Sequence, residues 1–166
     1  MQPNPSTASH RLNRRSGFTL VEVLVVLVVI GILAAIAVPS YLDSVQKSRR
    51  SEAMTGLVQL QQAQERWRAN NANYTTTLAS LSVAADTPSG YYTMSVVQAP
   101  GAVAVPLNAA YVAMAHGKNG TSQAADSTCR RMAVRMLGGS LTYAGCGSCT
   151  SFAAADFQPA HACFAR

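Results

Sequence analysis

The longest apolar run of the chain lies near its start. From Phe18 to Val38 only Thr19 and Glu22 carry polar side chains. As a helix this run would be about 30 Å long at ~1.5 Å per residue, which matches the hydrocarbon core of a bilayer. We therefore predict a membrane-spanning helix here. The arginines that precede the run predict that the rest of the chain lies on the periplasmic or outer side.

Beyond the run, apolar positions recur with the period of a helix and form one stripe. The stripe consists of Ala53, Leu57, Leu60, Gln64 and Trp67. One helix is therefore predicted from about Thr19 to about Ala69, with its second half packed on a globular domain. Gly31 and Pro39 fall inside it and are expected to loosen it, because glycine lowers helix propensity and proline removes a backbone hydrogen bond.

The second half of the chain shows the alternation and turn signals of strands. The strands are expected at Tyr91–Val97, Ala110–His116, around Met132–Met136 and at Leu141–Tyr143, with a hairpin turn at Gly138-Gly139. Residues 75–90 are expected to form a loop over one sheet face, and His116–Gly120 a turn with an exposed histidine. The predicted fold class is α+β, a long helix on an antiparallel sheet of about four strands.

Charge is sparse and unevenly placed. The chain has 13 basic and 7 acidic side chains, a net charge of +6, and only 12% charged residues. In the third strand Arg131 and Arg135 alternate with apolar residues, which predicts a basic, solvent-exposed face. The scattered acids form no catalytic constellation and no metal-ligand cluster. We therefore expect neither an enzyme nor a cofactor, and the composition fits an extracellular surface protein.

All four cysteines lie in the C-terminal quarter, on the predicted outer side of the membrane, where disulfides form. They are Cys129, Cys146, Cys149 and Cys163. An even number predicts two bridges, for which three pairings exist. The spacing of Cys146 and Cys149 is also that of redox and zinc motifs, but the glycine-rich loop around them and the distance to His161 disfavour both.

The segment RRSGFTLVEVLVVLVVIGILAAIAVPSYLDSVQKSRRSEA resembles the signal and N-terminal helix of type IV prepilins. The resemblance implies a pilin fold and a peptidase that cuts after Gly17 and methylates the new amine of Phe18. Residues 1–17 are then a cleaved leader, 18–40 the transmembrane and filament-core helix, and 41–166 the outer globular domain. Gly31 and Pro39 match the residues that loosen the helix in this family.

The same resemblance assigns an assembly role to Glu22, the fifth residue after the cut. A carboxylate in an apolar run needs a cation, and no lysine or arginine lies between residues 18 and 46. The expected partner is the amine of Phe18 on an adjacent subunit. The resemblance also implies a C-terminal loop closed by Cys129–Cys163, with Cys146–Cys149 as a small second ring.

The resemblance defines partners and location. It implies a prepilin peptidase that is also a methyltransferase, other pilins in a helical filament, and an inner-membrane assembly platform. The chain would cross the inner membrane of a Gram-negative-type bacterium once, and then join a pilus at the cell surface. No metal and no cofactor are implied.

Within the family, the segment QAQERWRANNANYTTTL resembles minor pilins of the PilE-like group. The leading hypothesis is a minor pilin serving pilus biogenesis, adhesion, twitching motility or DNA uptake. One alternative is a pseudopilin of a type II secretion system, although the cysteines and the shortage of acids at the C-terminus favour the pilus. Another is a tip pilin that binds DNA or a surface through Arg130, Arg131 and Arg135. Without the leader, ten basic and seven acidic side chains remain, a net charge of +3, which is weak support for nucleic-acid binding.

Two other readings of the N-terminus are open. A cleaved secretory signal would be cut after Ala35 or Ala37, but its apolar core would be shorter and Glu22 would have no role in it. A plain signal anchor would have the same topology as the pilin.

Overall fold

The computed structural model describes residues 17–101 and 105–165. The expected leader therefore lies outside the described residues, apart from Gly17. Contacts within the chain separate a unit that ends at Ser40 from a second unit, Tyr41–Arg166.

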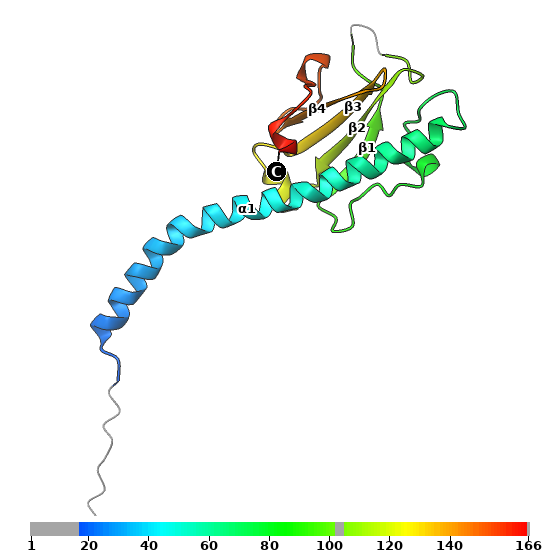
Figure 1. The fold of residues 1–166 in the computed structure, drawn as a ribbon. Helices are drawn as coiled ribbons and strands as arrows, with labels where there is room; N and C mark the ends of the chain where they lie inside the picture. Colours follow the sequence, from blue (N-terminus) through cyan, green and yellow to red (C-terminus); the bar gives the residue numbers. More distant parts are fainter. Residues whose placement is uncertain (1–16, 102–104, 166) are drawn as a thin grey trace, which may run out of the picture. The chain divides into compact units, whose positions relative to one another are not determined.

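Helix α1, Leu20–Arg68, is continuous through Gly31 and Pro39, as the sequence predicts to within a residue at each end. The large apolar side chains from Phe18 to Val38 are between 49% and 83% exposed. In the second half of α1 a single stripe is buried, made up of Ala53, Leu57, Leu60, Ala63 and Gln64. This half of the helix runs along one face of the sheet (Figure 1).

The sheet is a four-stranded antiparallel meander in the order β1-β2-β3-β4. Its strands are β1 Tyr92–Val97, β2 Ala110–Gly117, β3 Arg131–Leu137 and β4 Ser140–Cys146. Each strand is hydrogen-bonded to the next one along the chain, so turns or loops are enough to connect them. Figure 1 shows the four strands side by side. The predicted fold class is confirmed.

One face of the sheet and the stripe of α1 form the main core. Tyr92, Met94 and Val96 of β1 and Met132, Val134 and Met136 of β3 point into it. Side chains two positions apart point to the same face of a strand, so each set covers one face. Both sets lie in the segments where the sequence predicts strands. Leu81, from the short 3-10 helix η1 (Leu78–Leu81), closes this core, with Leu78 and Val83 partly buried beside it.

The opposite face of the sheet corrects the expectation of a basic, solvent-exposed surface on β3. Ala133 is fully buried there, in a second cluster with Val112, Ala144 and Phe157. Phe157 follows the short 3-10 helix η3, Ala154–Asp156, so the C-terminal segment covers this part of the sheet. Arg131 and Arg135 are consequently half-buried rather than exposed.

Local turn signals were reliable at the hairpin and less so at the end of β2. Gly138 and Gly139 both have positive φ, +55° and +83°, as a two-residue hairpin turn requires. Strand β2 continues through His116 and Gly117, and the turn begins only at Lys118. His116 is half-buried, and its Nε2 atom is fully buried with no hydrogen-bond partner among the described residues, so the expectation of an exposed histidine was wrong.

Candidate functional site

Thr19 and Glu22 form a reciprocal cap at the start of α1. The Glu22 amide donates to the Thr19 hydroxyl at 3.2 Å, and the Thr19 amide donates to the Glu22 carboxylate at 3.5 Å. This is a capping box, which satisfies two of the amides that a helix start leaves without partners. The pattern Thr-x-x-Glu was a sequence signal for this role, and our sequence analysis considered only the charge of Glu22.

Within the part of the chain that the structure describes, nothing covers the apolar side chains behind this cap. By length and composition, α1 is the one helix in the described part of the chain that could cross a membrane. Exposed side chains of this size cost free energy in water, at about 25 cal/mol per Å² of apolar surface. The segment therefore requires lipid or other apolar helices around it.

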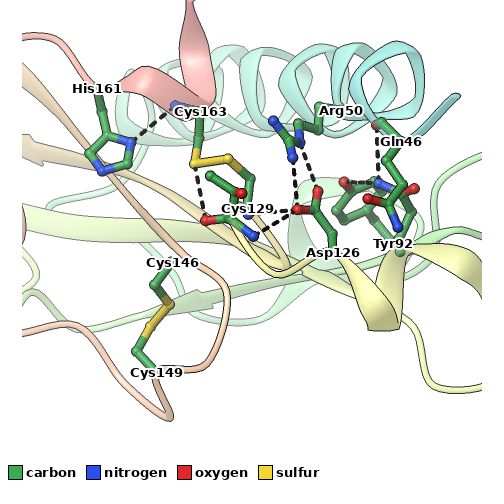
Figure 2. The surroundings of a disulfide bond; sticks show 11 residues. Gln46, Arg50, Tyr92, Asp126, Cys129, Cys146, Cys149, His161 and Cys163 are labelled. Carbon is green, nitrogen blue, oxygen red and sulfur yellow. Dashed lines mark hydrogen bonds and ion pairs between the residues drawn. A yellow bond between two sulfur atoms is a disulfide. The ribbon is translucent and has the colours of Figure 1, made fainter. Parts of the chain in front are cut away.

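In the second unit, a buried ion pair joins α1 to the segment between β2 and β3. Arg50 donates through Nε and Nη2 to the two oxygens of Asp126, each at 2.7 Å. The Asp126 side chain is 1% exposed and that of Arg50 14%. Figure 2 shows the two side chains directed at one another across the space between helix and loop. A bidentate pair with little access to water fixes both position and orientation.

Asp126 also holds the start of the disulfide loop. Its Oδ1 accepts from the backbone amides of Thr128 at 3.0 Å and Cys129 at 2.9 Å. Burial raises the pKa of Asp126, but the hydrogen bonds from Arg50 and from these two amides outweigh burial and leave the pKa below its usual value. The carboxylate is therefore charged at neutral pH.

A second set of contacts also joins α1 to the segment between β2 and β3. These contacts lie beside the 3-10 helix η2, Ser122–Ala125. Gln123 is fully buried and donates both to the Tyr92 hydroxyl at 2.6 Å and to the Gln46 carbonyl at 3.3 Å. Arg49 donates to the Ser122 hydroxyl and stacks over the Tyr91 ring, 3.9 Å from its centroid.

The structure joins Cys129 to Cys163 and Cys146 to Cys149 (Figure 2). These are the pairs that the family resemblance implied. The Cys163 amide donates to Nδ1 of His161 at 3.2 Å, within the segment that leads into the 3-10 helix η4, Ala162–Phe164. In the described residues no three His, Cys, Asp or Glu side chains gather where a metal could bind.

Basic side chains gather where β2 ends and β3 begins. We call His116, Lys118, Arg130 and Arg131 the basic cluster. His116 and Arg131 are cross-strand partners, and the Gly117 amide donates to the Arg130 carbonyl at 2.7 Å. Burial lowers the pKa of His116, and the charges of Arg131 and Arg130 lower it further. The imidazole is therefore neutral at pH 7.

Members of the cluster differ in how far they are already engaged. Lys118 pairs with Asp86 at 2.5 Å in a largely exposed contact, and Arg130 donates to Asn119 at 3.0 Å. Arg131 donates to the Thr150 carbonyl.

Arg135, farther along β3, lies outside the cluster. It donates to the Thr142 hydroxyl and the Ala154 carbonyl, and stacks over Phe157, 4.6 Å from the ring centroid. Arg131 and Arg135 thus hold the C-terminal segment on the sheet. Of the three arginines named from the sequence, the structure brings Arg130 and Arg131 close to His116 and leaves Arg135 farther along β3.

Two sequence comparisons identify the family. The family described as "Type IV minor pilin ComP, DNA uptake sequence receptor" matches residues 39–133, and the prokaryotic N-terminal methylation motif matches residues 12–38. The first match runs from the middle of α1 into β3, and the second covers the expected cleavage site and the apolar run.

Individual relatives match over shorter stretches. Core protein G of the type II secretion system of Klebsiella pneumoniae is 35% identical over 78 residues, which are 47% of this chain and 56% of that protein. The corresponding protein of Aeromonas hydrophila is 37% identical over 75 residues, 45% of this chain and 52% of that protein. The type IV major pilin PilA of Myxococcus xanthus is 43% identical over 61 residues, 37% of this chain and 28% of that pilin.

The chain spans about half the length of the secretion proteins that it matches. Pilins and pseudopilins have similar N-terminal segments, so these matches alone do not separate the two classes. The ComP match extends beyond that segment into the sheet and covers more than half of the chain. This chain belongs to the ComP family of type IV minor pilins.

Proposed function

We propose that the chain is made as a prepilin, is cut between Gly17 and Phe18, and enters a type IV pilus through its apolar helix. The match to the methylation motif across residues 12–38 is the observation that carries this proposal. The exposed apolar side chains of α1 add to it, because they need the cover that lipid gives before assembly and neighbouring helices give afterwards. Methylation of the Phe18 amine follows from the same motif.

The processing step is tested on filaments sheared from cells that express the chain. Mass spectrometry of the recovered subunit is expected to give an N-terminal peptide that begins at Phe18 with one added methyl group. A subunit that keeps its leader, or one cut after Ala35 or Ala37, would overturn the proposal.

The globular domain, on our proposal, binds DNA through the basic cluster. The name of the matched family carries this second function, since it describes a receptor for DNA uptake sequences. The structure supports it with cations near the end of β2, where a phosphate could be contacted: the charges of Arg130 and Arg131 both act on His116, and Lys118 directly follows the strand. Arg131 and Arg135 donate to backbone carbonyls of the C-terminal segment. The partners of Lys118 and Arg130 are side chains in exposed contacts, so we assign the first phosphate contacts to these two residues.

DNA binding is tested with the mature chain in detergent, by titration with duplex DNA at several salt concentrations. Phosphate contacts release counterions, so affinity should fall steeply with salt. Lys118→Gln and Arg130→Gln should each weaken binding and lower the slope of log affinity against log salt by about one.

Arg66→Gln is the matched control for this titration. Arg66 is an exposed arginine near the end of α1. It lies about 25 Å along the helix, at ~1.5 Å per residue, from Arg49. Arg49 lies near the basic cluster, because it stacks over Tyr91, whose carbonyl accepts from the Lys118 amide. Its replacement removes the same charge from the chain but not from the cluster. If all three variants weaken binding equally, only overall charge matters. If the two cluster variants bind like the unaltered chain, the assignment of the cluster is wrong.

A further inference from the structure

The turn that follows β2 contains the one Asn-Gly pair in the sequence, Asn119-Gly120. Both residues are exposed, and the turn is closed by the Thr121 amide, which donates to the Lys118 carbonyl at 3.2 Å. Asparagine is among the chemically labile residues of proteins. The reaction at issue is attack of the next residue's backbone nitrogen on the side-chain amide carbon.

The Asn119 side-chain amide, which the nitrogen would attack, is in contact with a cation. Arg130 donates through Nη2 to Oδ1 of Asn119 at 3.0 Å. A guanidinium has donors only, so the amide must present its oxygen to Arg130 and leave its NH₂ group directed elsewhere. A fixed positive donor at this oxygen stabilises the negative charge that develops on it when a nucleophile adds to the carbon.

The nucleophile is also accessible. Gly120 has φ +80°, and a Cβ added there would meet nothing within 4 Å. Glycine itself has no Cβ, so no side chain stands beside the attacking nitrogen. Among the described residues no hydrogen bond is formed by the Gly120 amide, so loss of its proton breaks no contact of the fold.

The geometry points to Asn119 as a site of self-modification, at which Arg130 promotes closure of a succinimide ring. The Gly120 nitrogen forms a bond to Cγ of Asn119, the Cγ–Nδ2 bond breaks, and the proton from Gly120 leaves with the amide as ammonia. Water then opens the imide, which yields aspartate or isoaspartate at position 119. No oxidant and no partner protein are needed.

The product places a carboxylate where a neutral amide stood. The new negative charge lies beside the guanidinium of Arg130 and can pair with it. The net positive charge of the basic cluster therefore falls by one. A filament subunit would therefore become less attractive to phosphate as it ages. This consequence rests on the proposed DNA binding, whereas the chemical step does not.

The test follows Asn119 in the purified mature chain, incubated in mildly alkaline buffer and sampled over time. Peptide mass mapping detects exchange of the side-chain NH₂ group for OH. Asn119 is expected to convert several-fold faster than Asn108, an exposed asparagine followed by alanine in the same chain. Arg130→Met should slow conversion of Asn119 several-fold, and Arg130→Lys, which keeps a cation, should keep most of the rate.

Lys118→Met is the matched control, because it removes a neighbouring cation whose ammonium group pairs with Asp86, whereas Arg130 donates to the Asn119 amide. It should leave the rate unchanged. Either of two results overturns the proposal. The first is that Asn119 converts no faster than Asn108. The second is that Arg130→Met leaves the rate of conversion unchanged or raises it, and Arg130→Lys converts at the same rate as Arg130→Met. The measurement uses no DNA, so a failure here and a failure of DNA binding are told apart.

Discussion

At the scale of single residues, Glu22 has one contact in the structure and one proposed task, and a substitution to alanine would remove both. Its carboxylate closes the cap with Thr19. From the family resemblance we propose that its charge pairs with the Phe18 amine of an adjacent subunit. An N-terminal cap contributes about 1 kcal/mol to a helix. An attraction between unit charges at ~4 Å contributes about 4 kcal/mol at an effective dielectric of 20. The charge should therefore dominate assembly, and the cap should affect only the first turn.

Replacement of Glu22 by glutamine and by alanine separates these tasks. Glutamine can occupy the same position in a capping box but carries no charge. We expect both variants to insert in the membrane and to be cut after Gly17, and both to be strongly depleted from sheared filaments. Subunit in filaments and in membranes is quantified by immunoblot.

The comparison between the two variants distinguishes the effect of the cap from the effect of the charge. If Glu22→Gln assembles as well as the unaltered chain and only Glu22→Ala is lost, the residue acts through the cap and the pairing of charges is wrong. A variant that disappears from both fractions reports degradation, so total protein is measured alongside.

At the scale of elements, the parts that follow from local patterns are the ones that the sequence predicts well. The stripe of α1 is set by a period of 3.6. Of its five expected members Ala53, Leu57, Leu60 and Gln64 are buried, and Trp67 is partly buried against the same core. The hairpin at Gly138-Gly139 needs positive φ at both residues, which few residues other than glycine supply. Each of these signals is carried by residues that lie close together in the sequence, and the structure retains both.

Strand β3 shows where this reasoning stops. Arg131 and Arg135 marked one face of the strand as polar, and an exposed basic face was the simplest interpretation. The structure covers that face with Phe157, and the arginines donate to carbonyls of the covering segment. The C-terminal segment has no period that would have announced this contact, and long side chains such as arginine bury their stems while their ends remain hydrogen-bonded.

The functional residues divide in the same way. Gly17, Phe18 and Glu22 belong to a contiguous motif, and the sequence alone was enough to propose them. The basic cluster depends on strand register, because His116 and Arg131 meet only through the pairing of β2 with β3. The sequence therefore supplied Arg130 and Arg131 as candidates but not their neighbours.

At the scale of the whole molecule, the pair of Arg50 and Asp126 connects parts that are 76 residues apart in sequence. No sequence pattern predicts this ion pair, because nothing in the sequence distinguishes Asp126 from other acidic residues in turns. In the folded domain it ties α1 to the loop that ends in Cys129. Loss of one partner from a buried ion pair leaves the other charge uncompensated, which costs about 3 kcal/mol. The exposed pair of Lys118 and Asp86 should matter far less, because water already surrounds both groups.

Asp126→Asn is predicted to lower the free energy of unfolding of the outer domain by about 3 kcal/mol at neutral pH, because Arg50 loses its charge partner. The folded state lowers the pKa of Asp126, so the pair's contribution is present above the ordinary aspartate pKa and is lost as the pH falls through the lowered value. The difference between variant and unaltered chain should therefore shrink as the pH falls below about 4.

Urea titrations of the mature chain in detergent, followed by the fluorescence of Trp67, measure this difference. Trp67 is the single tryptophan of the chain and packs against the main core, so its emission reports global unfolding. Asp86→Asn is the matched control, which removes an exposed carboxylate from a second ion pair and should leave the urea midpoint nearly unchanged at every pH. Equal losses in the two variants, or a loss for Asp126→Asn that stays constant down to strongly acidic pH, would show that the pair does not fasten the helix to the disulfide loop.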